Sequence, residues 1–208
     1  GFWEISQDDG GELIAAASQV LSGDQATPFW DVVPGVWYED AVRYVNEEGL
    51  MQGTTDTTFS PNRASTRGMI AAILYRLEGS PKAGRPPFTD VAGDAYCADA
   101  VAWAARKGII RGYEDGTFRP DGRITRQQLA AILLRYMEYK REDTSPRADP
   151  SAYRDAGTVE AYAREAMAWS VSTGLIQGRA GGTLDPGGSA TRAQTAVILQ
   201  RLCQLVEA

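Results

Sequence analysis

Three arginines of this chain stand at the same point of a repeated pattern, where each has the surroundings of an anion-binding residue. Thr66-Arg67, Thr125-Arg126 and Thr191-Arg192 each open an apolar stretch with helical spacing. The N-terminus of a helix offers unpaired N–H donors and the positive end of the helix dipole. Arginine adds a planar fork of donors and a full charge. The pattern therefore predicts three small sites for a carboxylate or a phosphate.

The elements that must position these arginines also recur three times. An aromatic residue stands 29 positions before each threonine, and the intervening residues predict a helix, a glycine, a short loop and a proline. The first helices are predicted over 38–48, 97–107 and 160–173, and the second helix of each repeat begins at the threonine. A two-helix unit of this length cannot bury its apolar stripe alone. We therefore expect the repeats to pack against one another.

The repeats define the predicted architecture, an all-α fold of three tandem two-helix repeats that form one domain. Repeat 1 covers residues 29–79, repeat 2 covers 87–139 and repeat 3 covers 153–206. Residues 1–28 lie outside the pattern. They are predicted to be a linker or a short helix, because residues 12–21 have helical apolar spacing.

Composition excludes several classes of function. Histidine is absent, which removes histidine acid–base chemistry, histidine-activated nucleophiles and most zinc sites. No carboxylate pair stands out for glycoside hydrolysis and no calcium-loop spacing is present, so we expect no enzyme, no metal and no cofactor. The net charge of −6 argues against nucleic acid, and no apolar run is long enough for membrane insertion.

Cysteine usage and the chain start leave two points open. Cys97 and Cys203 follow no metal or redox spacing, so we expect two thiols, with a disulfide between them as the alternative. The chain begins at Gly1 and has no signal peptide, which is typical of a fragment or a processed product and says nothing about compartment.

Each arginine also has a structural interpretation. Each arginine could pair with an aspartate of its own repeat and so brace that repeat. The aspartates stand at matching positions near the start of each repeat, and they are Asp31, Asp90 and Asp155.

Two sets of aromatics match in position as well. One set is expected to fill the core and the other to lie at a groove, where a ring can stack on a sugar, or else all six pack in the core. The sets are Trp37, Tyr96 and Tyr162, and Tyr44, Trp103 and Trp169.

The motifs together resemble the S-layer homology domain over residues 29–206. Repeat 2 carries the fullest version, with Gly108-Ile109-Ile110-Arg111-Gly112, Gly116-Thr117-Phe118-Arg119-Pro120 and Thr125-Arg126, and Phe-x-Asp or Tyr-x-Asp opens each repeat. The resemblance implies a pseudo-threefold helical spindle that serves as a non-catalytic anchor. It implies an exported protein held at the bacterial cell surface through a secondary cell-wall polysaccharide with a pyruvylated N-acetylmannosamine end, bound in grooves between repeats.

The resemblance also implies which residues bind. It assigns ligand contacts to the three arginines, the three aspartates and one aromatic of each repeat, namely Arg67, Arg126, Arg192, Asp31, Asp90, Asp155, Trp37, Tyr96 and Tyr162. The carboxylate of a pyruvate ketal suits the arginine site. The loops and helix starts differ between repeats, so the grooves are not expected to be equivalent, and the groove that uses Arg126 is expected to rank first.

Two other functions stay open from the sequence. One is an anchor that binds peptidoglycan instead of a pyruvylated polymer. The other is a scaffold that binds another protein, with the arginines as structural braces. In each case we expect the module to be monomeric.

Overall fold

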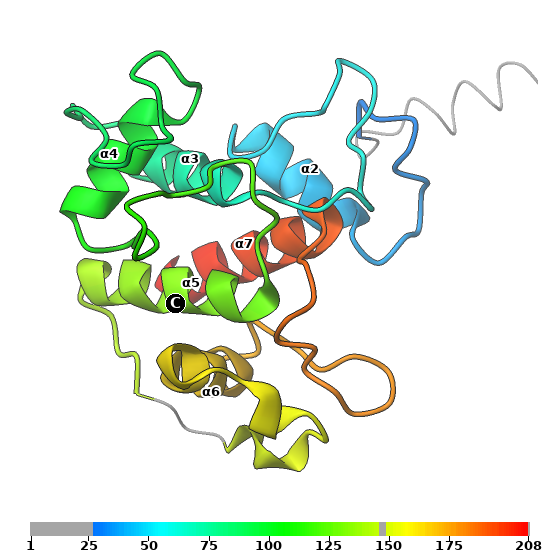
Figure 1. Ribbon diagram of the computed structural model, residues 1–208. Helices are drawn as coiled ribbons and strands as arrows, with labels where there is room; N and C mark the ends of the chain where they lie inside the picture. The colour runs from blue at the N-terminus through cyan, green and yellow to red at the C-terminus, as the bar shows by residue number, and fades with distance from the viewer. Residues whose placement is uncertain (1–26, 146–148, 208) are drawn as a thin grey trace, which may run out of the picture.

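The computed structural model describes residues 27–145 and 149–207, and this part of the chain is helical. It contains six α-helices and three short 3₁₀ turns, which are α2 (Glu39–Glu47), α3 (Arg67–Leu77), α4 (Ala98–Arg106), α5 (Arg126–Lys140), η1 (Pro150–Ala152), η2 (Ala156–Thr158), η3 (Ala161–Ala163), α6 (Arg164–Ser172) and α7 (Arg192–Glu207) (Figure 1). Within these ranges extended pairing is limited to isolated bridges. The predicted all-α class is confirmed, and the predicted helix over residues 12–21 lies outside the described residues.

The second helix of each repeat begins at its threonine cap, as predicted. Thr125 accepts the N–H of Gln128, whose side chain accepts the N–H of Thr125 in return, and Thr191 forms the same box with Gln194. Thr66 accepts the N–H of Met69 at 3.3 Å, but methionine cannot return the bond. The first helix of repeat 3 starts later than predicted, because 161–163 form a 3₁₀ turn.

Each second helix packs on the first helix of the next repeat, not on that of its own repeat. Helix α3 packs on α4, α5 packs on α6, and α7 returns to pack on α2 (Figure 1). The stripe of each second helix thus becomes part of one continuous core, which includes Trp103, Trp169, Phe59 and Phe118. This exchange of helices confirms that the repeats bury one another's apolar faces.

A closed ring of three backbone hydrogen bonds joins the repeats at the residue before each threonine. Ser65 donates its N–H to the carbonyl of Ala190 at 2.9 Å. Ala190 donates to Ile124 at 3.0 Å, and Ile124 donates to Ser65 at 3.0 Å. All three residues are fully buried, so each bond is shielded from water. The ring gives the three repeats a pseudo-threefold arrangement.

The helix starts next to the ring are already paired, contrary to the expectation of unpaired donors. The first two N–H groups of α3 donate to the carbonyls of Gly122 and Pro120, at 3.0 and 2.8 Å. Helices α5 and α7 donate in the same way, to Gly188 and Pro186 and to Arg63 and Pro61. The third N–H of each helix goes to the capping threonine. Binding of an anion at these helix starts therefore depends on side chains, because the backbone amides already donate to carbonyls of the next repeat.

The three arginines span the boundary between repeats. Arg67 donates from Nε to the carbonyl of Phe118 and from Nη2 to that of Arg111, both at 2.8 Å. Arg126 reaches Leu184 and Gln177 in repeat 3, and Arg192 reaches Phe59 and Gln52 in repeat 1. All three side chains are buried. Each arginine therefore braces the loop of the following repeat.

Two smaller points concern the rest of the described chain. Cys97 is buried, Cys203 is half-buried, and no disulfide joins them. Among the helices of residues 27–145 and 149–207, none combines the length and the apolar character that a membrane crossing needs.

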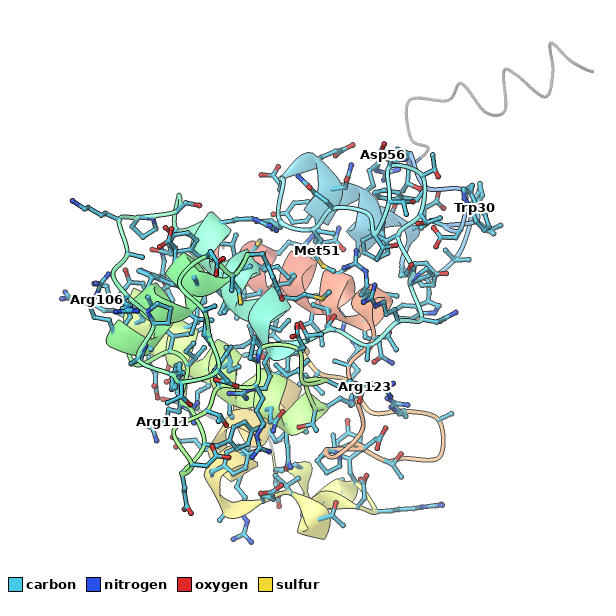
Figure 2. All side chains as sticks on the ribbon, turned by 45° about the horizontal axis from the view of Figure 1, so that its top comes forward. Trp30, Met51, Asp56, Arg106, Arg111 and Arg123 are labelled. Carbon is cyan, nitrogen blue, oxygen red and sulfur yellow. The ribbon has the colours of Figure 1, made fainter. Side chains whose placement is uncertain are left out.

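The bracing predicts a loss of stability when one arginine is removed. Arg126→Ala leaves the buried carbonyl of Leu184 and the part-buried carbonyl of Gln177 without this donor, and we expect the free energy of unfolding to fall by about 3 kcal/mol. Urea unfolding followed by circular dichroism measures this. Arg123→Ala is the matched control, because Arg123 is exposed and its side chain makes no hydrogen bond among the described residues (Figure 2). Equal stabilities of the two variants would contradict the bracing role.

Candidate functional site

An aspartate and an arginine from different repeats hold the same loop from two sides. Asp90 accepts the N–H of Phe118 and of Arg119, both at 2.7 Å, while Arg67 of repeat 1 binds the carbonyl of Phe118. The ring of Phe88 lies against Gly112 so closely that a Cβ there would clash, and this contact places Asp90 under the loop.

Repeats 1 and 3 have the same arrangement. Asp31 accepts the N–H groups of Phe59 and Ser60, and Asp155 accepts those of Leu184 and Asp185. Burial raises the pKa of Asp155, but the N–H groups of Leu184 and Asp185 outweigh it and keep the pKa below its usual value. The expected alternative of an ion pair between each arginine and the aspartate of its own repeat is wrong. The aspartate oxygens bind backbone amides, and the arginine extends to the neighbouring repeat.

The second residue held by each aspartate has left-handed backbone geometry, with φ of 57° at Ser60, 57° at Arg119 and 52° at Asp185. Residues other than glycine rarely adopt this backbone conformation, so the two hydrogen bonds to the aspartate carboxylate help to stabilise it. The conformation turns the side chain onto a loop partner. Arg119 lies over the ring of Tyr113, with Cζ 4.1 Å from the ring centre. The loop of repeat 2 is thus a rigid surface with an aromatic ring on it.

A groove of about 980 Å³ lies against this loop, and all three repeats contribute to it. Repeat 1 supplies Arg67, repeat 2 supplies the loop and one face of α5, and repeat 3 supplies Glu160 and Tyr162. The lining residues are Arg67, Arg111, Gly112, Tyr113, Glu114, Asp115, Arg119, Gln128, Ala131, Ile132, Arg135, Glu160 and Tyr162. The groove of the repeat 2 loop therefore uses Arg67. Arg126 crosses to the loop of repeat 3 in the same way, and the expectation that its groove ranks first stays a prediction.

Arg67 is a buried cation with spare donors. Its side chain forms no ion pair among the described residues, and Nη1 makes no hydrogen bond there, since its two hydrogen bonds use Nε and Nη2. Its Cζ lies 4.9 Å from the ring centre of Tyr113 and 4.6 Å from that of Phe118. Burial lowers the pKa of Arg67, and Tyr113 and Tyr162 oppose this effect. A desolvated guanidinium without a carboxylate favours the arrival of an anion.

The two aromatic sets separate as expected. Trp103 and Trp169 are buried in the core and Tyr44 packs against it, whereas Trp37, Tyr96 and Tyr162 are 67%, 64% and 48% exposed. The interpretation that places all six in the core is therefore wrong.

The exposed aromatics differ in their surroundings. Tyr162 lines the large groove together with Arg67. The hydroxyl of Tyr96 lies 3.5 Å from the hydroxyl of Thr66. Tyr96 also lines a pocket of about 260 Å³ together with Arg76. Trp37 packs edge-on against Tyr38. Of the predicted residues, the structure brings Arg67 and Tyr162 into one groove.

Sequence reasoning missed several residues of this groove. Tyr113, Gln128 and Arg135 line it, and Gln128 donates to the Tyr113 hydroxyl at 3.3 Å. A signal for Tyr113 was present, because the matching positions in repeats 1 and 3 are Thr54 and Arg179. An aromatic found in one repeat alone indicates that its loop has its own role.

The chemistry available in the groove is binding. Guanidinium groups can hold a carboxylate by paired hydrogen bonds, and exposed tyrosine rings can stack on an apolar sugar face. Within 27–145 and 149–207, no group of three or more metal-ligating side chains occurs.

Comparison with known proteins agrees with the repeats. The S-layer homology domain family matches three times, at residues 28–68, 87–130 and 152–196. An endoglucanase of Bacillus sp. (strain KSM-635) is 32% identical over 91% of this chain and 20% of its own length. The surface-layer 125 kDa protein of Lysinibacillus sphaericus is 31% identical over 82% of this chain and 14% of its own length.

A third relative is the cellulosome-anchoring protein of Acetivibrio thermocellus, 30% identical over 61% of this chain and 30% of its own length. The chain spans about a fifth or less of the first relatives, so the activities in their names concern much longer proteins. What they share with this chain is the repeat region, which is a cell-surface anchoring module. With three matches that together cover more than half of its residues, the chain belongs to the S-layer homology domain family.

Proposed function

We propose that this module binds an acidic secondary cell-wall polysaccharide, with a pyruvylated end, and so holds an exported protein at the bacterial surface. The proposal rests on the groove in which Arg67, a buried guanidinium with spare donors, shares the lining with the exposed ring of Tyr162. A pyruvate ketal presents a carboxylate fixed to a sugar ring. The guanidinium suits the carboxylate and the tyrosine ring suits the sugar.

The other predicted residues have matching roles in this proposal. Arg126 and Arg192 offer the same spare amino group beside the loops of repeats 3 and 1. Trp37 and Tyr96 supply further exposed rings. Asp31, Asp90 and Asp155 act by positioning, because both oxygens of each already accept loop amides. The module acts as a monomer and contributes no catalysis.

Removal of the ketals tests this function. We expect the chain to bind purified wall polysaccharide of its source, and to lose at least about tenfold in affinity after mild acid has removed the pyruvate, since a charge-assisted pair at a desolvated site is then missing. Biolayer interferometry with immobilised polymer measures both affinities.

The same experiment separates the alternatives. Binding that survives ketal removal would contradict the carboxylate mechanism, and peptidoglycan fragments would then be the next ligand to measure. Absence of binding to both polymer and peptidoglycan would favour the protein scaffold.

Tyr162→Ala should weaken binding without unfolding the protein. Its side chain is 48% exposed and donates no hydrogen bond among the described residues, so we expect unchanged thermal stability. Loss of the stacking surface should weaken affinity for the polymer by about fivefold. Trp30→Ala is the control, because Trp30 is 74% exposed at the outer edge of the molecule and does not line the groove (Figure 2). Equal affinity of the two variants for the polymer would contradict a role for Tyr162 in binding.

A further inference from the structure

Two arginines of the groove differ from their counterparts in the other repeats. Arg111 precedes the loop glycine of repeat 2, where repeats 1 and 3 have the neutral Gln52 and Gln177. Its carbonyl accepts a bond from Arg67, while its exposed side chain forms no ion pair in the part of the chain that the structure describes (Figure 2). Repeat 2 therefore has a positive charge at a loop position where the other two repeats have a neutral residue.

Arg135 differs from its counterparts in the hydrogen bonds of its side chain. Its counterparts Arg76 and Arg201 donate to carbonyls at the end of the first helix, at Leu50 (2.9 Å) and Gly174 (3.1 Å). Arg135 makes no such bond among the described residues and lines the groove instead. Burial lowers its pKa, and the positive charge of Arg111 adds to the effect. A residue that braces the fold in two repeats is thus available for binding in the third.

The groove's carboxylates leave this pair of arginines without a partner. Asp115 pairs with Arg119 at 2.8 Å, and Thr117 and Arg119 lower the pKa of Asp115 to about 2. Glu160 accepts from the Gln127 side chain at 2.7 Å. Glu114 is exposed and forms no ion pair in 27–145 or 149–207. The lining carries four arginines and three carboxylates, so its net formal charge is +1, although the whole chain is acidic.

The spacing separates this pair from the Arg67 end. Gln128, Ala131, Ile132 and Arg135 lie on one face of α5, and Gln128 contacts Tyr113, which lies beside Arg67. Seven residues of α5 separate Gln128 from Arg135, which is a rise of about 10 Å along the helix. Tyr162 lines the groove with both Arg67 and Arg135, and the charges of both arginines act on its hydroxyl. A rise of this length is greater than the span of one carboxylate.

We propose that the groove recognises two acidic sugars in succession, with the end carboxylate held at Arg67 and a carboxylate of the next unit held by Arg111 and Arg135. This subsite rests on the proposed function, because it extends the same groove. It makes the groove of the repeat 2 loop selective for a dianionic end, whereas the loops of repeats 1 and 3, with Gln52 and Gln177, select for the end unit alone.

Two disaccharides that differ in one group test the subsite. Both carry pyruvylated N-acetylmannosamine at the end, and the second unit is glucuronic acid in one and glucose in the other. We expect the whole chain to bind the glucuronic acid compound about fivefold more tightly in isothermal titration calorimetry, with the difference shrinking at high salt.

The variant Arg111→Gln/Arg135→Gln keeps hydrogen-bonding side chains and places at 111 the residue that the other repeats have. We expect it to bind both compounds with equal affinity, so that the ratio between the two affinities falls from about fivefold to about one. Arg123→Gln is the control outside the groove and should keep the fivefold preference. Thermal unfolding of each variant checks that the fold is intact.

The outcomes distinguish the subsite from the function. Equal binding of both compounds by the unaltered chain would overturn the second subsite and leave the proposed function standing. A preference that persists in the double variant would overturn the assignment to Arg111 and Arg135. Failure of the unaltered chain to bind either compound would overturn the proposed function and the subsite with it.

Discussion

Three hydrogen bonds among Ser65, Ile124 and Ala190 determine where everything else in this module can lie. Each residue is fully buried and stands directly before a capping threonine, so the ring sets the origin of three helices. The first two backbone amides of each of these helices and the arginine side chain then pair with the following repeat. No repeat can satisfy these groups alone, and a buried unpaired amide or carbonyl is costly. The three two-helix units therefore depend on one another.

The same exchange makes the binding groove a composite of all repeats. Arg67, Tyr113 and Tyr162 come from repeats 1, 2 and 3, and they lie together only when the ring is closed. Arg67 uses two nitrogens to brace a loop and leaves a third for a ligand. Stability and binding thus share one side chain, so the loss of an arginine cannot by itself distinguish an anchor from a brace. Exposed residues such as Tyr162 and Arg111, which carry little of the fold, report on binding more cleanly.

The sequence allowed the helices, caps and aromatic sets to be predicted, because they depend on local pattern. Thr125 with Gln128 is a capping box in both the sequence and the structure. The two aromatic sets were recognised by their matching positions, although the residues alone did not say that Trp103 and Trp169 belong to the buried set. The partners across repeats could not be predicted, since a spacing of 29 residues does not say whether an arginine turns to its own loop or the next. In the structure the arginine turns to the next repeat, so Arg67 lies at the repeat 2 loop. The helix amides that were expected to be unpaired also donate to the next repeat.

Native-state hydrogen exchange at the amides of Ser65, Ile124 and Ala190 tests the closed ring most directly. Because the repeats complete one another, these amides can open only when the whole module unfolds. A closed ring predicts that all three amides exchange with the same free energy, equal to that of global unfolding measured with urea. Exchange of one amide at a free energy several kcal/mol below the other two would show that a repeat opens on its own, and would contradict the account.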